Sequence, residues 1–424
     1  MDNGFTQSKY DECFYYKKIF KGSRINKLLV TMHVDDCECA GKPQDLLAFK
    51  KALVKQFGEV KEQEWEFRHC GIDYTQTRDY KKLTHSQKQF VDAMKFQSLG
   101  KANMKDKTRL LNAKEQTMFR SILGGLQWLT HSRSDHCAEC SRLQTKRNSP
   151  TVEDLKDAHA LLRRCKDTAA EAVLTFRKQE HTSKRILVFP DASLNSIRKK
   201  DKNGKTMEEK RTQAGWLILL TSDTETLDSS NVHVLNWASR KVTRVSKSTL
   251  ASEAVARVGA VEDAVRCAGW LEEIYGPEQT TADLICKQET GNFMFPVDIA
   301  TDARALHEVI ISPMEPKPSD PGCLLWLKYL REMHQKKIMR RAIWTSTVDM
   351  LGDGLTKDKE NIELRKLFKD GVIKMKYSSL SGSAVVDGYK GRPPTKKERE
   401  EQGYNLVSAI FDCFFLKSRD QTEN

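Results

Sequence analysis

Residues 185–193, RILVFPDAS, form the stretch that decides how the second half of the chain folds. Their apolar run predicts a buried strand that leads into Asp191. After it, strands are expected at residues 213–222, 232–239, 295–301 and 338–347, and a long helix at residues 248–275. Three shorter helices are also expected: one begins at Ala303, one ends near Lys336, and one covers residues 348–356. This succession of strands and helices is typical of an α/β domain.

Four acidic residues stand beside these apolar stretches. They are Asp191 in LVFPDAS, Glu253 in STLASEAVA, Asp302 in VDIATDARAL and Asp353 in DMLGDGLTK. A fold that brought the four segments together would gather four carboxylates, which repel one another unless cations lie between them. Hard divalent ions such as Mg²⁺ take oxygen ligands, and a pair of them supports in-line attack of water on a phosphodiester. Any one of these acids is also explained as a helix cap or a turn residue.

The composition favours a polyanionic partner. The 424 residues include 71 Lys plus Arg against 58 Asp plus Glu, a formal net charge of +13, and the basic residues recur along the whole chain. Nucleic acid fits this balance, although a basic surface without a ligand also produces it. Eleven irregularly spaced cysteines behind a polar N-terminus predict a reduced, intracellular compartment. The apolar run at residues 406–416 is shorter than the ~20 residues that cross a bilayer, so no membrane segment is expected.

The first half of the chain is expected to mix strands and helices. Strands are predicted at residues 27–34 and 66–74, and helices at residues 44–57, 86–96, 113–143 (one long or two short) and 152–167. Cys137 and Cys140 form a C-x-x-C without the second pair of a zinc finger, and are interpreted as helix cysteines. The charged segment 198–211, with its Asn-Gly turn signal, is expected to be solvated, and residues 392–402 to be a linker.

Several motifs succeed one another along the chain: GFTQSKYDECFYYK, VDDCECAG, FKKALVKQFGEV, CGIDYTQ, LTHSQKQFV, FRSILGGLQWLTHSRSD and finally DGLTK. Each is weak alone, but in this order they resemble the Pol polyprotein of copia-type (pseudovirus) LTR retrotransposons, from the C-terminal end of the reverse transcriptase through the RNase H. The resemblance implies a partial palm and thumb remnant at residues 1–100, a helical connection region at residues 101–184, an RNase H-like domain at residues 185–357 and a C-terminal tail at residues 358–424.

The resemblance implies a mixed five-stranded RNase H-like sheet with flanking helices, and hydrolysis of the RNA strand of RNA–DNA hybrids with two Mg²⁺ ions, or Mn²⁺ in their place. By this comparison Asp191 would bridge both ions and Asp302 would be the second central ligand. Glu253 would hold one ion and help to orient the RNA 2′-hydroxyl, and Asp353 would complete the side of the attacking water. This chain has PDASL where many family members have SDADW, and Ala251-Ser252 where they have a further Glu-Ala.

The polymerase signature departs further from the family. Val34-Asp35-Asp36 matches it, but His33 stands where the family has tyrosine, and the strand with the third catalytic Asp is expected upstream of Met1. Asp35 and Asp36 are therefore interpreted as a polymerase remnant in a chain that either starts late or has decayed.

The basic run ASRKVTRVSK is expected to contact the phosphates of the hybrid through Arg240, Lys241, Arg244 and Lys247, with a solvated loop as the other interpretation. Three functions remain open: an active RNase H, a decayed nucleic-acid-binding remnant, and a fragment of a larger active reverse transcriptase polyprotein. The expected partners are RNA–DNA hybrid or other nucleic acid and further Pol products, in a cytoplasmic particle or in the nucleus.

Overall fold

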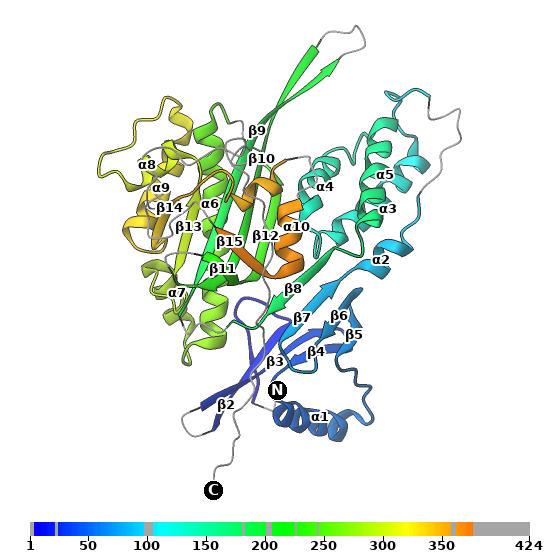
Figure 1. Ribbon diagram of the computed structural model, residues 1–424, viewed down its shortest axis with the longest axis vertical. Helices are drawn as coiled ribbons and strands as arrows, with labels where there is room; N and C mark the ends of the chain where they lie inside the picture. The colour runs from blue at the N-terminus through cyan, green and yellow to red at the C-terminus, as the bar shows by residue number, and fades with distance from the viewer. Residues whose placement is uncertain are drawn as a thin grey trace.

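The computed structural model describes residues 4–21, 24–96, 105–179, 183–200, 206–224, 227–243, 246–357 and 362–375. Figure 1 shows a large sheet with helices on both faces, beside a helical lobe and two smaller sheets built mainly from the first half of the chain. Within these ranges, no helix is long and apolar enough to cross a membrane. The apolar run at 406–416 and the expected linker at 392–402 lie outside the described residues.

The large sheet is mixed and five-stranded, in the order β12-β10-β9-β13-β14. Its strands are β9 (Lys184–Lys200), β10 (Thr206–Ser222), β12 (His233–Lys241), β13 (Val297–Thr301) and β14 (Arg341–Trp344). β10 is antiparallel to both β9 and β12, whereas β13 is parallel to both β9 and β14. The mixed α/β architecture, with flanking helices, agrees with the expectation from the sequence.

Both faces of this sheet are buried, which explains the unbroken apolar run of β9. Successive side chains of a strand point to opposite faces. Ile186 and Val188 pack with α6 (Thr249–Tyr275), α8 (Arg304–Ile311) and α9 (Leu324–Gln335). Leu187 and Phe189 enter a second core on the other face.

The last described segments of the chain cover the second core. The 3₁₀ helix η4 (Leu351–Leu355), α10 (Ile362–Asp370) and β15 (Val372–Met375) all contribute to it, and β15 pairs with β11 (Leu227–Asn231). Part of the expected tail, residues 362–375, is thus a helix and a strand packed on the large sheet.

The first half forms two smaller sheets and a helical lobe. The first sheet contains β1 (Thr6–Gln7), β2 (Phe14–Lys21), β3 (Arg24–His33) and β4 (Asp36–Ala40), followed by α1 (Pro43–Phe57). The second contains β5 (Glu66–His69), β6 (Ile72–Gln76), β7 (Lys82–Ser86) and β8 (Val173–Arg177). The lobe contains α2 (Lys88–Ala93), α3 (Ala113–Leu129), η2 (Ser134–His136), α4 (Cys137–Gln144), α5 (Val152–Asp167) and most of one core.

One local prediction needs correction, and two other segments are defined further by the structure. The strand expected over residues 66–74 is a hairpin, because Cys70 and Gly71 have φ values of 48° and 75° and reverse the chain between β5 and β6. For residues 113–143, where one long or two short helices were left open, the structure forms two α-helices, α3 and α4. In the charged segment 198–211, β9 and β10 continue their ladder as far as Lys200↔Thr206 and project as a ribbon (Figure 1), while the Asn-Gly signal lies outside the described residues.

Candidate active site

The four acidic residues come from four separate elements. Asp191 lies in β9, Asp302 directly follows β13, Glu253 lies early in α6, and Asp353 lies in η4. Because Val188 of β9 pairs in parallel with Ile299 of β13, the third residue beyond each pairing partner lies at the same edge of the sheet. These residues are Asp191 and Asp302.

The remaining two acids reach this edge from the helices on either face. The backbone N–H of Ala192 donates to the Glu253 carboxylate, which places Glu253 beside the part of β9 that carries Asp191. Ser248 caps the start of α6, since its hydroxyl accepts from the N–H of Ala251 at 3.1 Å.

Asp353 is brought to the edge by glycines that allow a close approach of η4. A Cβ atom on Gly352 would lie 2.4 Å from the carbonyl oxygen of Phe189, and one on Gly215 would lie 2.7 Å from the Cβ of Leu355. Larger residues at either position would push η4 off the sheet. The glycines of DMLGDGLTK and QAGWLILLTS therefore set how near Asp353 comes to Asp191.

The charges of the four acids act on one another. Burial, then the neighbouring Asp353 and Asp302, raise the pKa of Asp191 to about 7. Burial, then Asp191 and Asp302, raise the pKa of Glu253 to about 9. Burial, then Asp353, also raise the pKa of Asp302. The structure thus brings together all four acids that the sequence singled out.

Two residues of the DGLTK motif, which the sequence reasoning did not assign, contact the cluster. The Thr356 hydroxyl donates to Asp191 Oδ2, and Lys357 Nζ forms an ion pair with Asp353. Burial opposes the charge of Lys357, but Asp353, Asp191 and Asp302 together raise its pKa above the ordinary value. An ammonium group therefore supplies part of the positive charge that the carboxylates attract. The four-residue spacing from Asp353 to Lys357 is the signal that could have found this pair.

Arg257 is a further functional candidate that the sequence reasoning missed. It follows Glu253 by one helical turn of α6, its side chain is 0% exposed, and its Nε, Nη1 and Nη2 atoms have no hydrogen-bond partner among the described residues. Burial lowers the pKa of Arg257 to about 10, while Glu253 and Asp302 act to raise it. Burial and then Arg257 also lower the pKa of the nearby His307 to about 4, so this histidine is neutral at pH 7.

The donor set suits a hard divalent cation. Carboxylate oxygens dominate it, and Mg²⁺ prefers oxygen ligands. Burial is the largest cause of the raised pKa values of Asp191 and Glu253, and Lys357 and Arg257 act to lower these values. Within the described ranges, however, no group of three or more His, Cys, Asp or Glu side chains is arranged to hold a metal ion.

Part of the basic run lies beside this edge of the sheet. Arg240 and Lys241 end β12, and Lys247 precedes α6, whereas Arg244 lies outside the described residues. The Arg240 guanidinium stacks 5.0 Å from the ring centroid of Trp216, and lies 3.8 Å from Asp263. Its side chain is still 65% exposed. Trp216 itself is buried.

Asp35 and Asp36 lie far along the chain from these acids, at the β3–β4 hairpin. His33 pairs with Asp36, Val34 turns the chain with a φ of 55°, and both aspartates are exposed. The structure places them at a hairpin tip.

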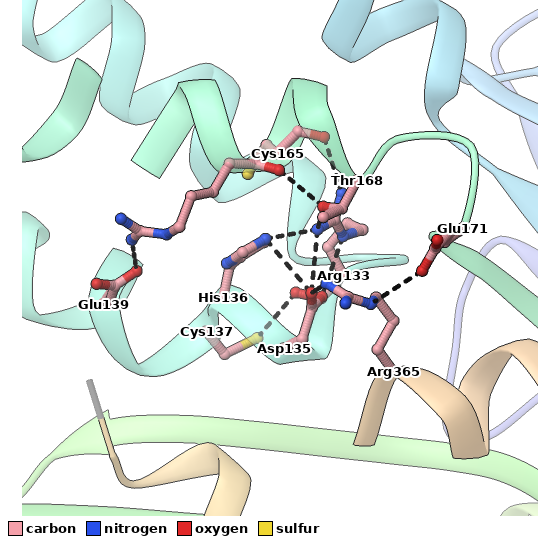
Figure 2. A network of polar contacts seen from close by, with 10 residues as sticks. Arg133, Asp135, His136, Cys137, Glu139, Cys165, Thr168, Glu171 and Arg365 are labelled. Atoms are coloured by element: carbon pink, nitrogen blue, oxygen red, sulfur yellow. Dashed lines mark hydrogen bonds and ion pairs between the residues drawn. The ribbon is translucent and has the colours of Figure 1, made fainter. Parts of the chain in front are cut away.

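A second polar cluster joins the helical lobe to the large sheet (Figure 2). Arg133 and Asp135 are both 3% exposed, and two Arg133 nitrogens each lie 3.0 Å from an Asp135 oxygen. Arg133 also donates to Thr168 Oγ1 at 2.8 Å, and Arg365 of α10 lies 3.9 Å from Asp135. Cys137, next in the chain to His136, is a buried residue of α4, as is Cys140, which agrees with their interpretation as helix cysteines.

Comparisons of the chain with protein-family models, with curated proteins and with solved structures gave no match.

The pKa values of the cluster predict how pH acts on the metal-free protein. Ordinary carboxylates titrate near pH ~4 in unfolded chains, whereas the folded values are about 7 for Asp191 and about 9 for Glu253. The protonated acids therefore favour the folded state, so their stabilising contribution is complete below the unfolded pKa and is lost as pH rises through the folded values. We expect the Tm in EDTA to fall as pH rises from the unfolded pKa to the folded values of Asp191 and Glu253. Mg²⁺ should raise the Tm most at the alkaline end of this pH range.

Thermal unfolding of the full chain at a series of pH values, with EDTA or with Mg²⁺, measures this effect. Asp191→Asn is the matched variant, because it removes one charge without changing the side-chain shape. Its Tm in EDTA should depend less on pH than that of the wild type. Parallel pH curves for the two proteins would contradict the assignment of the pH dependence to this cluster.

Proposed function

We propose that this chain is a divalent-metal-dependent endonuclease that hydrolyses the RNA strand of RNA–DNA hybrids, through an RNase H-like domain attached to a partial reverse transcriptase of copia-type retrotransposon origin. The observation that carries this proposal is the convergence of four acids, from β9, α6, η4 and the end of β13, at one edge of a mixed sheet. The electrostatic coupling of Asp191 with Asp302, Asp353 and Glu253 supports it.

The residues that would hold two Mg²⁺ ions are Asp191, Glu253, Asp302 and Asp353. Bound ions of this kind activate a water and stabilise the leaving oxygen of a phosphodiester. Asp191 is central to the arrangement, because Thr356 fixes one of its oxygens and its charge acts on Glu253. Lys357 would exchange its partner Asp353 for a substrate phosphate or remain as a counter-charge.

Full-length protein should cleave the RNA strand of a hybrid in Mg²⁺ or Mn²⁺ and leave 3′-hydroxyl and 5′-phosphate ends. The full chain is the appropriate sample, because α10 and β15 complete the core behind β9, and Ser8 of the N-terminal segment donates to Glu273 of α6 at 2.6 Å. Absence of cleavage with both ions, in a protein that binds hybrid, would favour the second candidate, a nucleic-acid-binding remnant. The Lys357–Asp353 ion pair is the observation that favours that candidate, since it occupies a carboxylate that an ion would need.

Charge reversal in the basic run should weaken binding without changing sequence preference. Replacing Arg240, Lys241, Arg244 and Lys247 by Glu is expected to lower hybrid affinity uniformly, and to reduce the slope of log affinity against log salt by ~0.9 for each phosphate that the protein no longer neutralises. Because Arg240 also packs over Trp216, the Lys241→Glu/Lys247→Glu pair separates binding from packing. Fluorescence anisotropy over a salt series measures both quantities.

Reversing two exposed lysines, Lys328 of α9 and Lys336 directly after it, provides a control with the same change of charge as that pair. An unchanged salt slope in the Lys241/Lys247 variant would show that the run is only a solvated loop. A loss of affinity for one sequence alone would show that it reads bases.

The chain by itself should not extend a primer. Nucleotidyl transfer needs metal ions held by carboxylates from more than one side, whereas Asp35 and Asp36 lie exposed at a hairpin, and the described residues include no acidic group arranged with them to hold an ion. A primer-extension assay with template, dNTPs and Mg²⁺ checks this. Incorporation that disappears in Asp35→Asn would mean that another part of this chain completes a polymerase site.

A further inference from the structure

The β3–β4 hairpin carries two thiols that the proposed nuclease does not use. They belong to Cys37 and Cys39, and their sulfur atoms lie 3.9 Å apart. The two residues alternate along β4, so both side chains project from the same face of the strand. Both cysteines are free, Cys37 is exposed and Cys39 is half-buried, so solvent reaches the pair.

A third sulfur belongs to the same face. The register of the hairpin places Met32 of β3 directly opposite Cys37. Directly opposed residues point to the same face with Cβ atoms about 4.5–5.5 Å apart. Met32 is 38% exposed, and its flexible thioether side chain is within reach of the space above the two thiols.

The spacing of the two sulfurs fits a shared metal ion. Zinc–thiolate bonds are about 2.3 Å long. The two sulfur atoms lie 3.9 Å apart, so an ion bound to both of them would have a sulfur–ion–sulfur angle of about 116°. This angle lies between the tetrahedral and the trigonal values. A disulfide would require the sulfurs to approach to about 2.05 Å.

The chemistry of the three sulfurs selects the class of ion. Thiolates and thioethers are soft ligands that favour Zn²⁺ and Cu⁺, whereas Mg²⁺ and Ca²⁺ favour oxygen. We propose that Cys37, Cys39 and Met32 form a binding site for one soft, thiophilic cation of the Zn²⁺ or Cu⁺ class. The site lies on a different sheet from Asp191 and Asp302, so it is independent of the proposed nuclease function.

Cadmium is a suitable first probe, because it binds thiolates and produces a charge-transfer absorption in the ultraviolet. Reduced, metal-free full-length protein would be titrated with Cd²⁺ in an excess of Mg²⁺. We expect the wild type to bind one equivalent that is lost, or at least tenfold weaker, in Cys37→Ser and in Cys39→Ser. Cys286→Ser, which changes an exposed cysteine on α7 (Thr281–Thr290), is the matched control and should bind Cd²⁺ as the wild type does.

Two further titrations distinguish the ions. Competition against a Zn²⁺ indicator and against a Cu⁺ chelator would be compared in the wild type and in Met32→Leu. Weaker Cu⁺ binding with unchanged Zn²⁺ binding would assign the thioether to a Cu⁺ site, and equal binding of both ions would remove Met32 from the ligands.

The proposal is overturned if the Cys37→Ser/Cys39→Ser double variant keeps the Cd²⁺ stoichiometry and affinity of the wild type. It is also overturned if the wild type produces no thiolate absorption with micromolar Cd²⁺. Mass mapping that finds a Cys37–Cys39 disulfide in protein that binds none of the three ions would assign the pair to redox chemistry instead.

Discussion

Asp302→Asn is expected to abolish cleavage of the RNA strand, with a loss of at least about 10³-fold in kcat. Lewis-acid stabilisation by a bound ion is worth several kcal/mol, and each ~1.4 kcal/mol of barrier is a factor of ten in rate. Asp191→Asn should have the same effect, because its carboxylate is coupled to Asp302 and Asp353. Cleavage of a labelled hybrid under single-turnover conditions measures the loss.

The same substitutions should not lower stability, because each removes one of several carboxylates that repel their neighbours. The Tm of the metal-free variants should equal or exceed that of the wild type. Asp167→Asn, which changes an exposed aspartate at the C-terminal end of α5, is the matched control and should leave both rate and Tm unchanged. Full activity in Asp302→Asn would disprove the metal-site assignment.

Asp135→Ala is expected to give the largest loss of stability, about 3–5 kcal/mol. The substitution would leave the guanidinium of Arg133 buried without its carboxylate partner, and would remove the partner that Arg365 of α10 approaches. Burial acts to raise the pKa of Asp135, but His136, Arg133 and Arg365 outweigh it, and the pKa lies below its ordinary value. The Asp135 carboxylate therefore stabilises the folded state fully above the unfolded pKa, and this stabilisation is lost as pH falls through the folded pKa.

Glu171→Ala is the control, because Glu171 also faces Arg365 but is 58% exposed. Exposed ion pairs contribute about 0–1 kcal/mol, so this variant should unfold close to the wild type. Urea unfolding of both variants, followed by circular dichroism, makes the comparison. Arg133→Met/Asp135→Leu should recover part of the loss. If Asp135→Ala unfolds within about 1 kcal/mol of the wild type, as expected only for an exposed pair, the cluster does not hold the lobe to the sheet.

Local sequence patterns were sufficient to predict most elements of the large sheet and its long helix. Residues 248–275 were expected to be a helix and form α6 from Thr249 to Tyr275. Residues 152–167 form α5 as expected, because Leu155, Ala158, Leu161 and Leu162 follow the period of a helix. The four candidate acids were also found from local context, since each stands beside an apolar stretch.

The sequence by itself determined which segments are strands and helices and which carboxylates border them, because both depend on residues close together in the chain. Only the tertiary structure decided that the first part of β9 lies beside β13, that Thr356 binds Asp191, and that Arg257 lies buried behind Glu253. It also decided that β8 joins the sheet of β7 and that residues 362–375 close the second core. These contacts depend on which apolar faces pack against one another. Local periodicity predicts that a segment has an apolar face, but it does not predict which other segment packs against that face.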